Sequence, residues 1–184
     1  MGKAKGTTMI QAVKVLRLKK DEARKVLPEH LHRYLDLERI LASSWYPEED
    51  YLAILRALAK VSPDPGMDIY EFMGLVWARI DLGRRGIYAH LIRQGDPATT
   101  LRRTSVIWGL CHDTGKKEVV ESGDDYVVTE ISGYEHPSRE ACGIVKGWNA
   151  ELAALAGGKE VRVDHEKCVL AGASACRFKV TWTR

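Results

Sequence analysis

Apolar residues recur at intervals of three and four through the first two-thirds of the chain, a spacing typical of amphipathic helices. One such run covers residues 22–41, and Pro28 predicts a break within it, because proline lacks the amide hydrogen that a helix interior needs. The proline and three acids at 46–50 predict a helix start, since acids favour the first turn. Helices are also predicted over 68–80, from the turn at 83–86 through 91, and from 96 to about 111.

The pattern changes to alternation after residue 113. Strands are predicted over 117–121, 126–132, 160–165 and 175–183, with a helix over 137–155. In the last strand Cys176, Phe178, Val180 and Trp182 alternate with polar residues, which predicts one buried face and one solvated face. Helices followed by hairpins without regular βαβ alternation indicate an α+β fold, in which an N-terminal helical half packs on a small antiparallel sheet.

Length and composition fit one globular domain over residues 1–184, and we expect residues 1–8 to be a disordered tail. No apolar run is long enough to span a membrane, and no secretory signal is visible, so the sequence predicts a cytoplasmic protein without membrane insertion. The formal net charge of +3 is weakly basic, and no nucleic-acid-binding motif accompanies it. We therefore expect no nucleic-acid partner.

Three of the four cysteines fall in the last third of the chain, together with one well-placed histidine. His165 and Cys168 are three residues apart, and the loop before Cys176 can return the chain beside them as a hairpin. Cys142 lies on the apolar stripe of the preceding helix, which must pack on the sheet. Three thiolates and an imidazole are a normal ligand set for structural zinc. The alternative is three buried apolar thiols and an ordinary histidine.

Strand alternation selects the fourth ligand. His165 shares its side of the strand with Val161 and Val163, whereas Glu166 lies on the opposite side. The imidazole is therefore predicted to point inward. Cys111 lies apart in the helical half and is predicted not to bind the metal.

The segment from His165 to Val180, with its Cys168, glycine-containing loop, Cys176 and Phe178, resembles the C-terminal signature of the 4-vinyl reductase domain family. That family includes the ligand-sensing domains of phenol-responsive activators, and it is related to haem nitric oxide-binding domains and to transport protein particle subunits. The resemblance covers about residues 134–182. It implies a zinc site at Cys142, Cys168 and Cys176, with His165 in place of the acid that the family uses.

The resemblance implies a zinc-stabilised, non-enzymatic sensor or binding module for a small apolar ligand. It also implies a homodimer formed through the helical part, and an unidentified protein partner that would carry any output. A scaffolding module similar to the trafficking subunits is the main alternative. A haem binder or a tetrapyrrole vinyl reductase is the third reading.

Aromatic residues in the helical half and on the sheet favour an apolar cavity of some hundreds of cubic ångströms between the two layers. Trp108 and His112 are the candidate ligand-binding residues, as polar groups at one end of that cavity. Close packing of the same side chains as a core, with His112 as an ordinary helix-end histidine, is the alternative.

Overall fold

A computed structural model describes residues 2–36 and 39–183 of the chain. The N-terminal part combines a small two-stranded sheet with helices: β1 (Lys3–Lys5), α1 (Gly6–Leu18), α2 (Lys20–Val26), η1 (Glu29–Leu31), α3 (Arg33–Asp36), β2 (Trp45–Pro47) and α4 (Glu48–Val61). Strands β1 and β2 pair antiparallel. The predicted break at Pro28 is confirmed, because α2 ends before it. The predicted helix start at 46–50 is confirmed by α4.

The middle of the chain is helical, and two of its helices begin at acids that cap them. The elements are α5 (Ile69–Leu82), η2 (Ala89–Leu91), α6 (Pro97–Thr104) and α7 (Ile107–Cys111). The Asp68 carboxylate accepts hydrogen bonds from backbone amides in the first turn of α5, and Asp96 accepts one from the first turn of α6. These caps satisfy amides that have no partner inside the helix.

The last third forms a four-stranded antiparallel sheet and one long helix. Its elements are β3 (Lys116–Ser122), β4 (Tyr126–Ser132), α8 (Arg139–Leu155), β5 (Lys159–Lys167), η3 (Val169–Ala171) and β6 (Cys176–Thr183). The strand order is β3-β4-β6-β5, so each hairpin contributes one inner strand. The predicted α+β class with an antiparallel sheet is confirmed.

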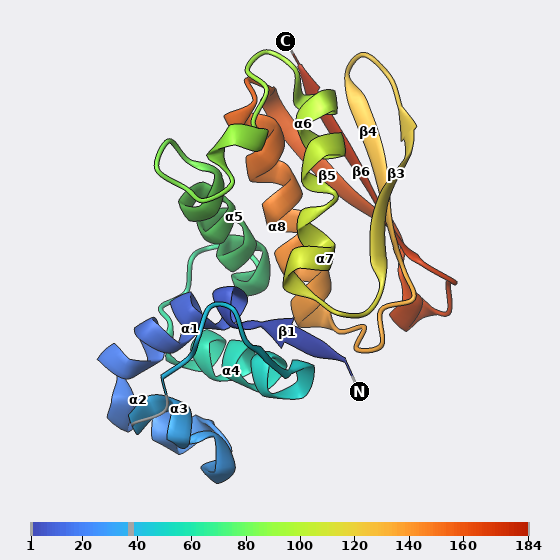
Figure 1. The fold of residues 1–184 in the computed structure, drawn as a ribbon. Helices are drawn as coiled ribbons and strands as arrows, with labels where there is room; N and C mark the ends of the chain where they lie inside the picture. The colour runs from blue at the N-terminus through green and yellow to red at the C-terminus, as the bar shows by residue number, and fades with distance from the viewer. Residues whose placement is uncertain (1, 37–38, 184) are drawn as a thin grey trace.

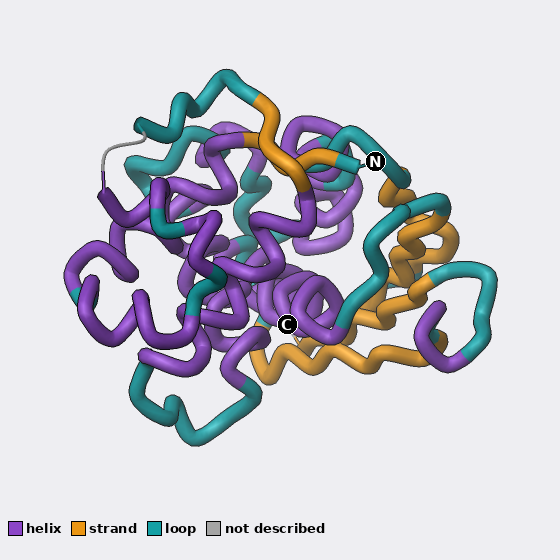
Figure 2. Tube along the Cα trace, turned by 90° about the horizontal axis from the view of Figure 1, so that it is seen from below, coloured by secondary structure: helices purple, strands orange, loops and turns teal. Residues whose placement is uncertain are grey.

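The helices gather on one face of this sheet (Figures 1 and 2). In Figure 1, α6, α7 and α8 lie against the strands, α5 covers α8, and α1 to α4 form the lower part of the molecule. One hydrophobic cluster lies mainly among α1 to α4, and a second joins α6, α7 and α8 to the sheet. Helix α5 contributes to both clusters, and the candidate cavity lies where they meet.

Two glycines allow α5 and α8 to cross closely. A Cβ atom on Gly147 would lie 1.8 Å from the backbone oxygen of Glu71, and one on Gly74 would lie 2.1 Å from that of Ile144. Both neighbours are backbone atoms that cannot rotate away. The close approach positions α8 between α5 and the sheet, and α8 carries residues of both candidate sites.

Four expectations about local structure are wrong. Residues 3–8 form β1 and the start of α1 instead of a disordered tail, because β1 pairs with β2 and Ala4 is fully buried. The predicted helix at 96–111 is split into α6 and α7, and the run through 91 is reduced to the short η2. The predicted run to residue 41 is helical only to Asp36 in the described part. Residue 1 of the predicted tail and residues 37–38 of the predicted run lie outside the described residues.

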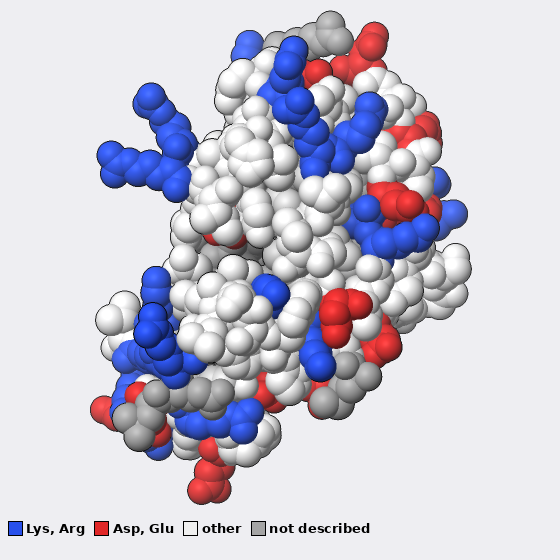
Figure 3. Space-filling view, in the orientation of Figure 1, with Lys and Arg blue, Asp and Glu red and all other residues white. Residues whose placement is uncertain are grey.

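No helix among the described residues combines the length and apolar character needed to cross a membrane. On the face in Figure 3, basic and acidic side chains lie near one another around the edge, and the centre is mostly uncharged. A hollow is visible between the upper and lower halves, and acidic atoms lie within it.

Candidate metal centre and helix–sheet cavity

The structure brings Cys142, His165, Cys168 and Cys176 together, with one potential ligand atom from each lying within 4.8 Å of all the others. Cys142 comes from the first turn of α8, His165 from β5, and Cys176 begins β6. The Cys142 Sγ lies 4.0 Å from that of Cys168 and 3.9 Å from that of Cys176. Cys142, Cys168 and Cys176 all carry free thiols. The grouping predicted from the sequence is therefore present, and binding of a metal by it stays a prediction.

Local backbone geometry positions each of these side chains. Ser138 caps α8 by accepting a hydrogen bond from the Ala141 amide, which begins the helix just before Cys142. Strands β5 and β6 pair antiparallel, so the turn through η3 returns Cys176 beside Cys168. Gly172 in that turn has a φ of +89°, a conformation that glycine adopts without strain.

His165 points toward the sheet interior, as the strand alternation predicted. Its ring stacks on Phe178, with centroids 4.2 Å apart and an interplanar angle of 11°. Its Nε2 atom is buried and has no hydrogen-bond partner. Glu166, on the opposite side of β5, is exposed. A buried imidazole nitrogen without a partner beside three thiols is the donor that a metal ion would satisfy.

Burial favours the neutral forms of the groups in the cluster. Burial, together with the neighbouring thiols, raises the pKa of Cys142, and burial raises that of Cys176. Burial is also the main cause that lowers the pKa of His165, and the Lys146 ammonium adds to it. Metal coordination needs thiolates and a neutral imidazole, so a divalent cation would have to offset the burial and the mutual repulsion that hold the thiols protonated.

One backbone contact already suits a thiolate. The Val169 amide donates a hydrogen bond to the Cys176 Sγ over 3.4 Å. Three thiolates and one imidazole match the composition and number of a closed tetrahedral zinc site. Cys111 lies outside the cluster and lines the cavity described next, and its predicted lack of metal binding stays a prediction.

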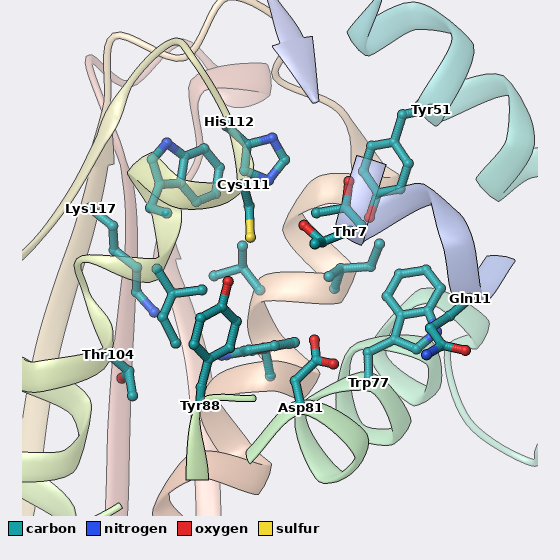
Figure 4. Close-up of a pocket in the computed structure, with 16 residues that line it drawn as sticks. Thr7, Gln11, Tyr51, Trp77, Asp81, Tyr88, Thr104, Cys111, His112 and Lys117 are labelled. Carbon is teal, nitrogen blue, oxygen red and sulfur yellow. The ribbon is translucent and has the colours of Figure 1, made fainter. Parts of the chain in front are cut away.

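A cavity of about 100 Å³ lies between the helices and the sheet (Figure 4). Its walls come from α1, α4, α5, α6, α7, α8 and β3. They include five large aromatic side chains: Tyr51, Trp77, Tyr88, Trp108 and Trp148. The cavity is smaller than the predicted hundreds of cubic ångströms. Aromatic side chains occupy much of the space between the layers, so the expected size is wrong for this cavity, although the adjoining one has about 220 Å³.

Trp108 and His112 both line this cavity, with their rings stacked 4.4 Å apart. Their polar atoms, however, bond to the protein. The Trp108 indole N–H donates to the carbonyl oxygen of Thr114 at 3.0 Å. The His112 Nδ1 lies 3.1 Å from the fully buried Glu48 carboxylate, which also accepts a hydrogen bond from the Tyr134 hydroxyl at 2.7 Å. Ligand contact by Trp108 and His112 stays a prediction.

Sequence reasoning missed two charged residues of the cavity, Asp81 and Lys117. Asp81 follows Trp77 by one helical turn on α5, so both lie on the same helix face. Lys117 shares its side of β3 with Val119. These spacings were a usable signal, but a charged residue on a half-buried face is ordinarily assigned to solvent.

A second cavity, of about 220 Å³, adjoins the cluster of candidate metal ligands. Its lining includes Cys142 and Cys176 from the cluster and Trp108 and Val145 from the first cavity. The cluster and the two cavities therefore lie along α8.

Comparison with known proteins gives similarity of fold only. No family model matches the chain, and no curated protein matches it. Solved structures of H-NOX proteins do match over nearly the whole chain. An H-NOX protein from S. oneidensis in the Fe(II)NO ligation state is 13% identical, with a TM-score of 0.69, 98% of this chain covered and 99% of that one.

Two further H-NOX structures are similar to the chain. A point mutant of the H-NOX protein from K. algicida, in the Fe(II) unliganded state, is 12% identical with a TM-score of 0.66, over 98% of this chain and 97% of that one. A point mutant of the H-NOX protein from T. tengcongensis is 14% identical with a TM-score of 0.64, over 98% of each chain. These structures therefore show that the chain shares the H-NOX fold. The resemblance to the 4-vinyl reductase family is matched by no family model.

Proposed function

We propose that the protein is a sensory or binding module that holds a small molecule between its helices and its sheet, and that a structural zinc ion at Cys142, His165, Cys168 and Cys176 fixes this arrangement. The observation that carries the proposal is the convergence of the four ligand atoms within 4.8 Å. The similarity of fold to H-NOX structures, one of them described in a gas-ligated state, supports the sensory part.

Helix α8 links the two sites. Cys142 lies one turn before Val145 and less than two turns before Trp148, and both of these residues line the cavity. Zinc bound at the cluster would tie the start of α8 to the β5–β6 hairpin. Helix α8 would thereby hold the cavity wall in place. Ligand binding and metal binding are therefore expected to be coupled in their effect on stability.

We propose a binding role and not a catalytic one. Four protein ligands complete a tetrahedral zinc shell and leave no position for water or a substrate. A signal from the cavity would then pass to a protein partner, whose identity is open. A scaffolding role predicts the same metal site, so ligand binding is the property that separates the two.

Metal content is the first test. Protein purified without chelator is expected to contain about one zinc per chain by elemental analysis. Replacing Cys168 or Cys176 by serine should abolish zinc binding and lower the melting temperature, whereas Cys111→Ser should retain the metal. Retention of zinc by the Cys176→Ser protein, or its loss from the Cys111→Ser protein, would show that the ligand assignment is wrong.

Ligand binding is the second test. Small compounds of neutral, cationic, anionic and zwitterionic types are added, while tryptophan fluorescence and the melting temperature are followed. A ligand that binds only the folded state raises the melting temperature. If no class does so, the scaffolding reading is favoured.

Haem is the rival ligand that the structural neighbours suggest, and the cavity does not fit it. A tetrapyrrole needs space on the order of several hundred cubic ångströms, as other large ligands do, whereas the two cavities along α8 have about 100 Å³ and about 220 Å³. A larger surface hollow of about 610 Å³, near Trp182, is lined by no histidine, cysteine, methionine or tyrosine among the described residues that could bind iron. Added hemin is expected to give no stoichiometric, protein-bound absorption spectrum.

A further inference from the structure

The Asp81 carboxylate lacks a protein partner in the cavity. Among residues 2–36 and 39–183, no hydrogen bond or ion pair to this carboxylate is present, although its backbone carbonyl accepts a bond from the Tyr88 amide. Figure 4 shows the carboxylate pointing into the cavity between Tyr88 and Trp77. Burial raises its pKa to about 6, so the group is ionised at neutral pH. A half-buried anion of this kind is costly unless a cation meets it.

A positive charge on the sheet, the Lys117 ammonium, lies at the same cavity. Lys117 of β3 lines the same cavity, and its ammonium donates to the Asn149 Oδ1 at 2.6 Å. No carboxylate in the described ranges pairs with it. Burial lowers its pKa to about 8, so it remains largely protonated at neutral pH. Figure 4 places its ammonium and the Asp81 carboxylate on opposite sides of Tyr88.

The aromatic walls add a preference for a cation beside Asp81. The faces of Trp and Tyr rings attract ammonium groups through the ring quadrupole, and Trp77 and Tyr88 flank the carboxylate. Burial raises the pKa of Tyr88 to about 12, so its hydroxyl is a neutral donor and acceptor. The surroundings of Asp81 thus resemble an ammonium site more than a metal site, since the Asp81 carboxylate is the only anionic group among the described residues that line the cavity.

We infer that the cavity binds a small zwitterion of the amino acid class, with its ammonium group at Asp81 between Trp77 and Tyr88 and its carboxylate at Lys117. This inference rests on the proposed ligand-binding function and names the ligand class. Such a ligand gives each charge an opposite partner. A simple amine would leave Lys117 unpaired, and a simple carboxylate would leave Asp81 unpaired. The cavity volume of about 100 Å³ limits the ligand to a short chain.

The test compares β-alanine with its two singly charged analogues, propylamine and propionate. Calorimetry and tryptophan fluorescence measure binding to the zinc-containing protein, and the melting temperature reports stabilisation. β-Alanine is expected to bind more tightly than either analogue. Replacing Asp81 by Asn, or Lys117 by Met, should weaken β-alanine binding by about tenfold or more, the range for losing a charged hydrogen bond.

Matched variants separate a local effect from a folding defect. Asp125→Asn and Lys116→Met remove the same charges at exposed positions and should leave β-alanine affinity unchanged. Asp81→Asn removes an unpaired half-buried charge, so the ligand-free variant should be at least as stable as the original protein. Lys117→Gln gives a second neutral variant that keeps a polar end.

The outcomes separate this inference from the proposed function. If neutral aromatic compounds raise the melting temperature and β-alanine does not, the zwitterion inference is wrong and the binding function stands. If β-alanine binds equally well to the Asp81→Asn protein, it occupies another place and the inference is also wrong. If no compound of any class binds, the proposed binding function itself fails.

Discussion

The ring of His165 lies parallel to that of Phe178, and the two residues are direct cross-strand partners on β5 and β6. The stacking fixes the plane of the imidazole and leaves its buried Nε2 without a hydrogen-bond partner, beside the three thiols. An imidazole held in this way needs little further ordering to bind a metal ion. The relationship therefore supports the metal assignment independently of the cysteine spacing.

His165→Ala is expected to lower zinc affinity by more than about a hundredfold, because loss of even an outer hydrogen-bond partner of a ligand costs about ten- to hundredfold. Competition with a chromophoric chelator measures the affinity. Glu166→Ala, at the exposed neighbouring position, is the control and should bind zinc normally. An equal loss in both variants would indicate damage to β5 in place of a missing ligand.

The Asp81 carboxylate should make stability fall as pH rises through a defined window. Burial raises its folded pKa from 3.8 to about 6, so between these values the folded state holds a proton that the unfolded state has released. The group's contribution to the free energy of unfolding therefore decreases from about pH 4 to about pH 6 and is constant above.

Denaturant unfolding of the Asp81→Asn protein across this range measures the effect. The difference in unfolding free energy between variant and original protein should increase in favour of the variant up to about pH 6, near the folded pKa of Asp81, and then level off. Asp125→Asn, at an exposed turn position, should show a small and nearly constant difference. If the difference in unfolding free energy between Asp81→Asn and the original protein does not change with pH, the Asp81 charge is not buried as described.

Affinity for β-alanine should be highest between about pH 6 and about pH 8, where Asp81 is ionised and Lys117 is protonated. The other ionisable side chains that line the cavity are Tyr51, Tyr88, Cys111 and His112. Burial raises the pKa of Tyr88 and that of Cys111 to about 12, which keeps both neutral in this window. Calorimetric titrations at several pH values test this, and an affinity that does not decline on both sides would argue against paired recognition.

Gly147→Ala is expected to lower the free energy of unfolding by about 2 kcal/mol or more, as overpacking of a close contact does. The added methyl group would meet the Glu71 backbone oxygen and force α5 away from α8. Gly109→Ala on α7 is the matched control, since a Cβ atom there meets open space. That change should be neutral or stabilise by up to about 1 kcal/mol, because alanine favours helix. Chemical denaturation compares the two, and similar effects would show that the close crossing is not what requires glycine.

The predicted homodimer should form through the N-terminal helices. Val15 and Leu18 are three residues apart on α1, and Leu18 is 86% exposed. Light scattering at micromolar concentration should give the mass of two chains, and a Val15→Lys, Leu18→Lys variant should give the mass of one. Leu170→Lys, at an exposed site in η3, should remain dimeric. A monomer in the unmodified protein would reject the dimer.

The sequence by itself determined the features that depend on neighbouring residues. Strand alternation placed His165 inward and Glu166 outward, and proline at 28 broke a helical run. The spacing from Cys168 to Cys176 predicted a hairpin that reunites the two thiols. These features are local, because side-chain direction in a strand and the missing proline amide follow from the backbone alone.

Only the tertiary structure decided what meets across the chain. Asp81 and Lys117 line one cavity because α5 packs on α8 and Lys117 of β3 reaches Asn149 of α8, and no local pattern records that meeting. Ala4 of β1 pairs with His112, and the Glu48 carboxylate of α4 bonds to the His112 ring. Ala4 was expected in a disordered tail and Glu48 in a helix start, so the sequence did not indicate that either would lie beside His112. The cavity size was misjudged for the same reason. The volume left between aromatic side chains depends on how they interlock in three dimensions, whereas the sequence sets only their sizes and the faces on which they lie.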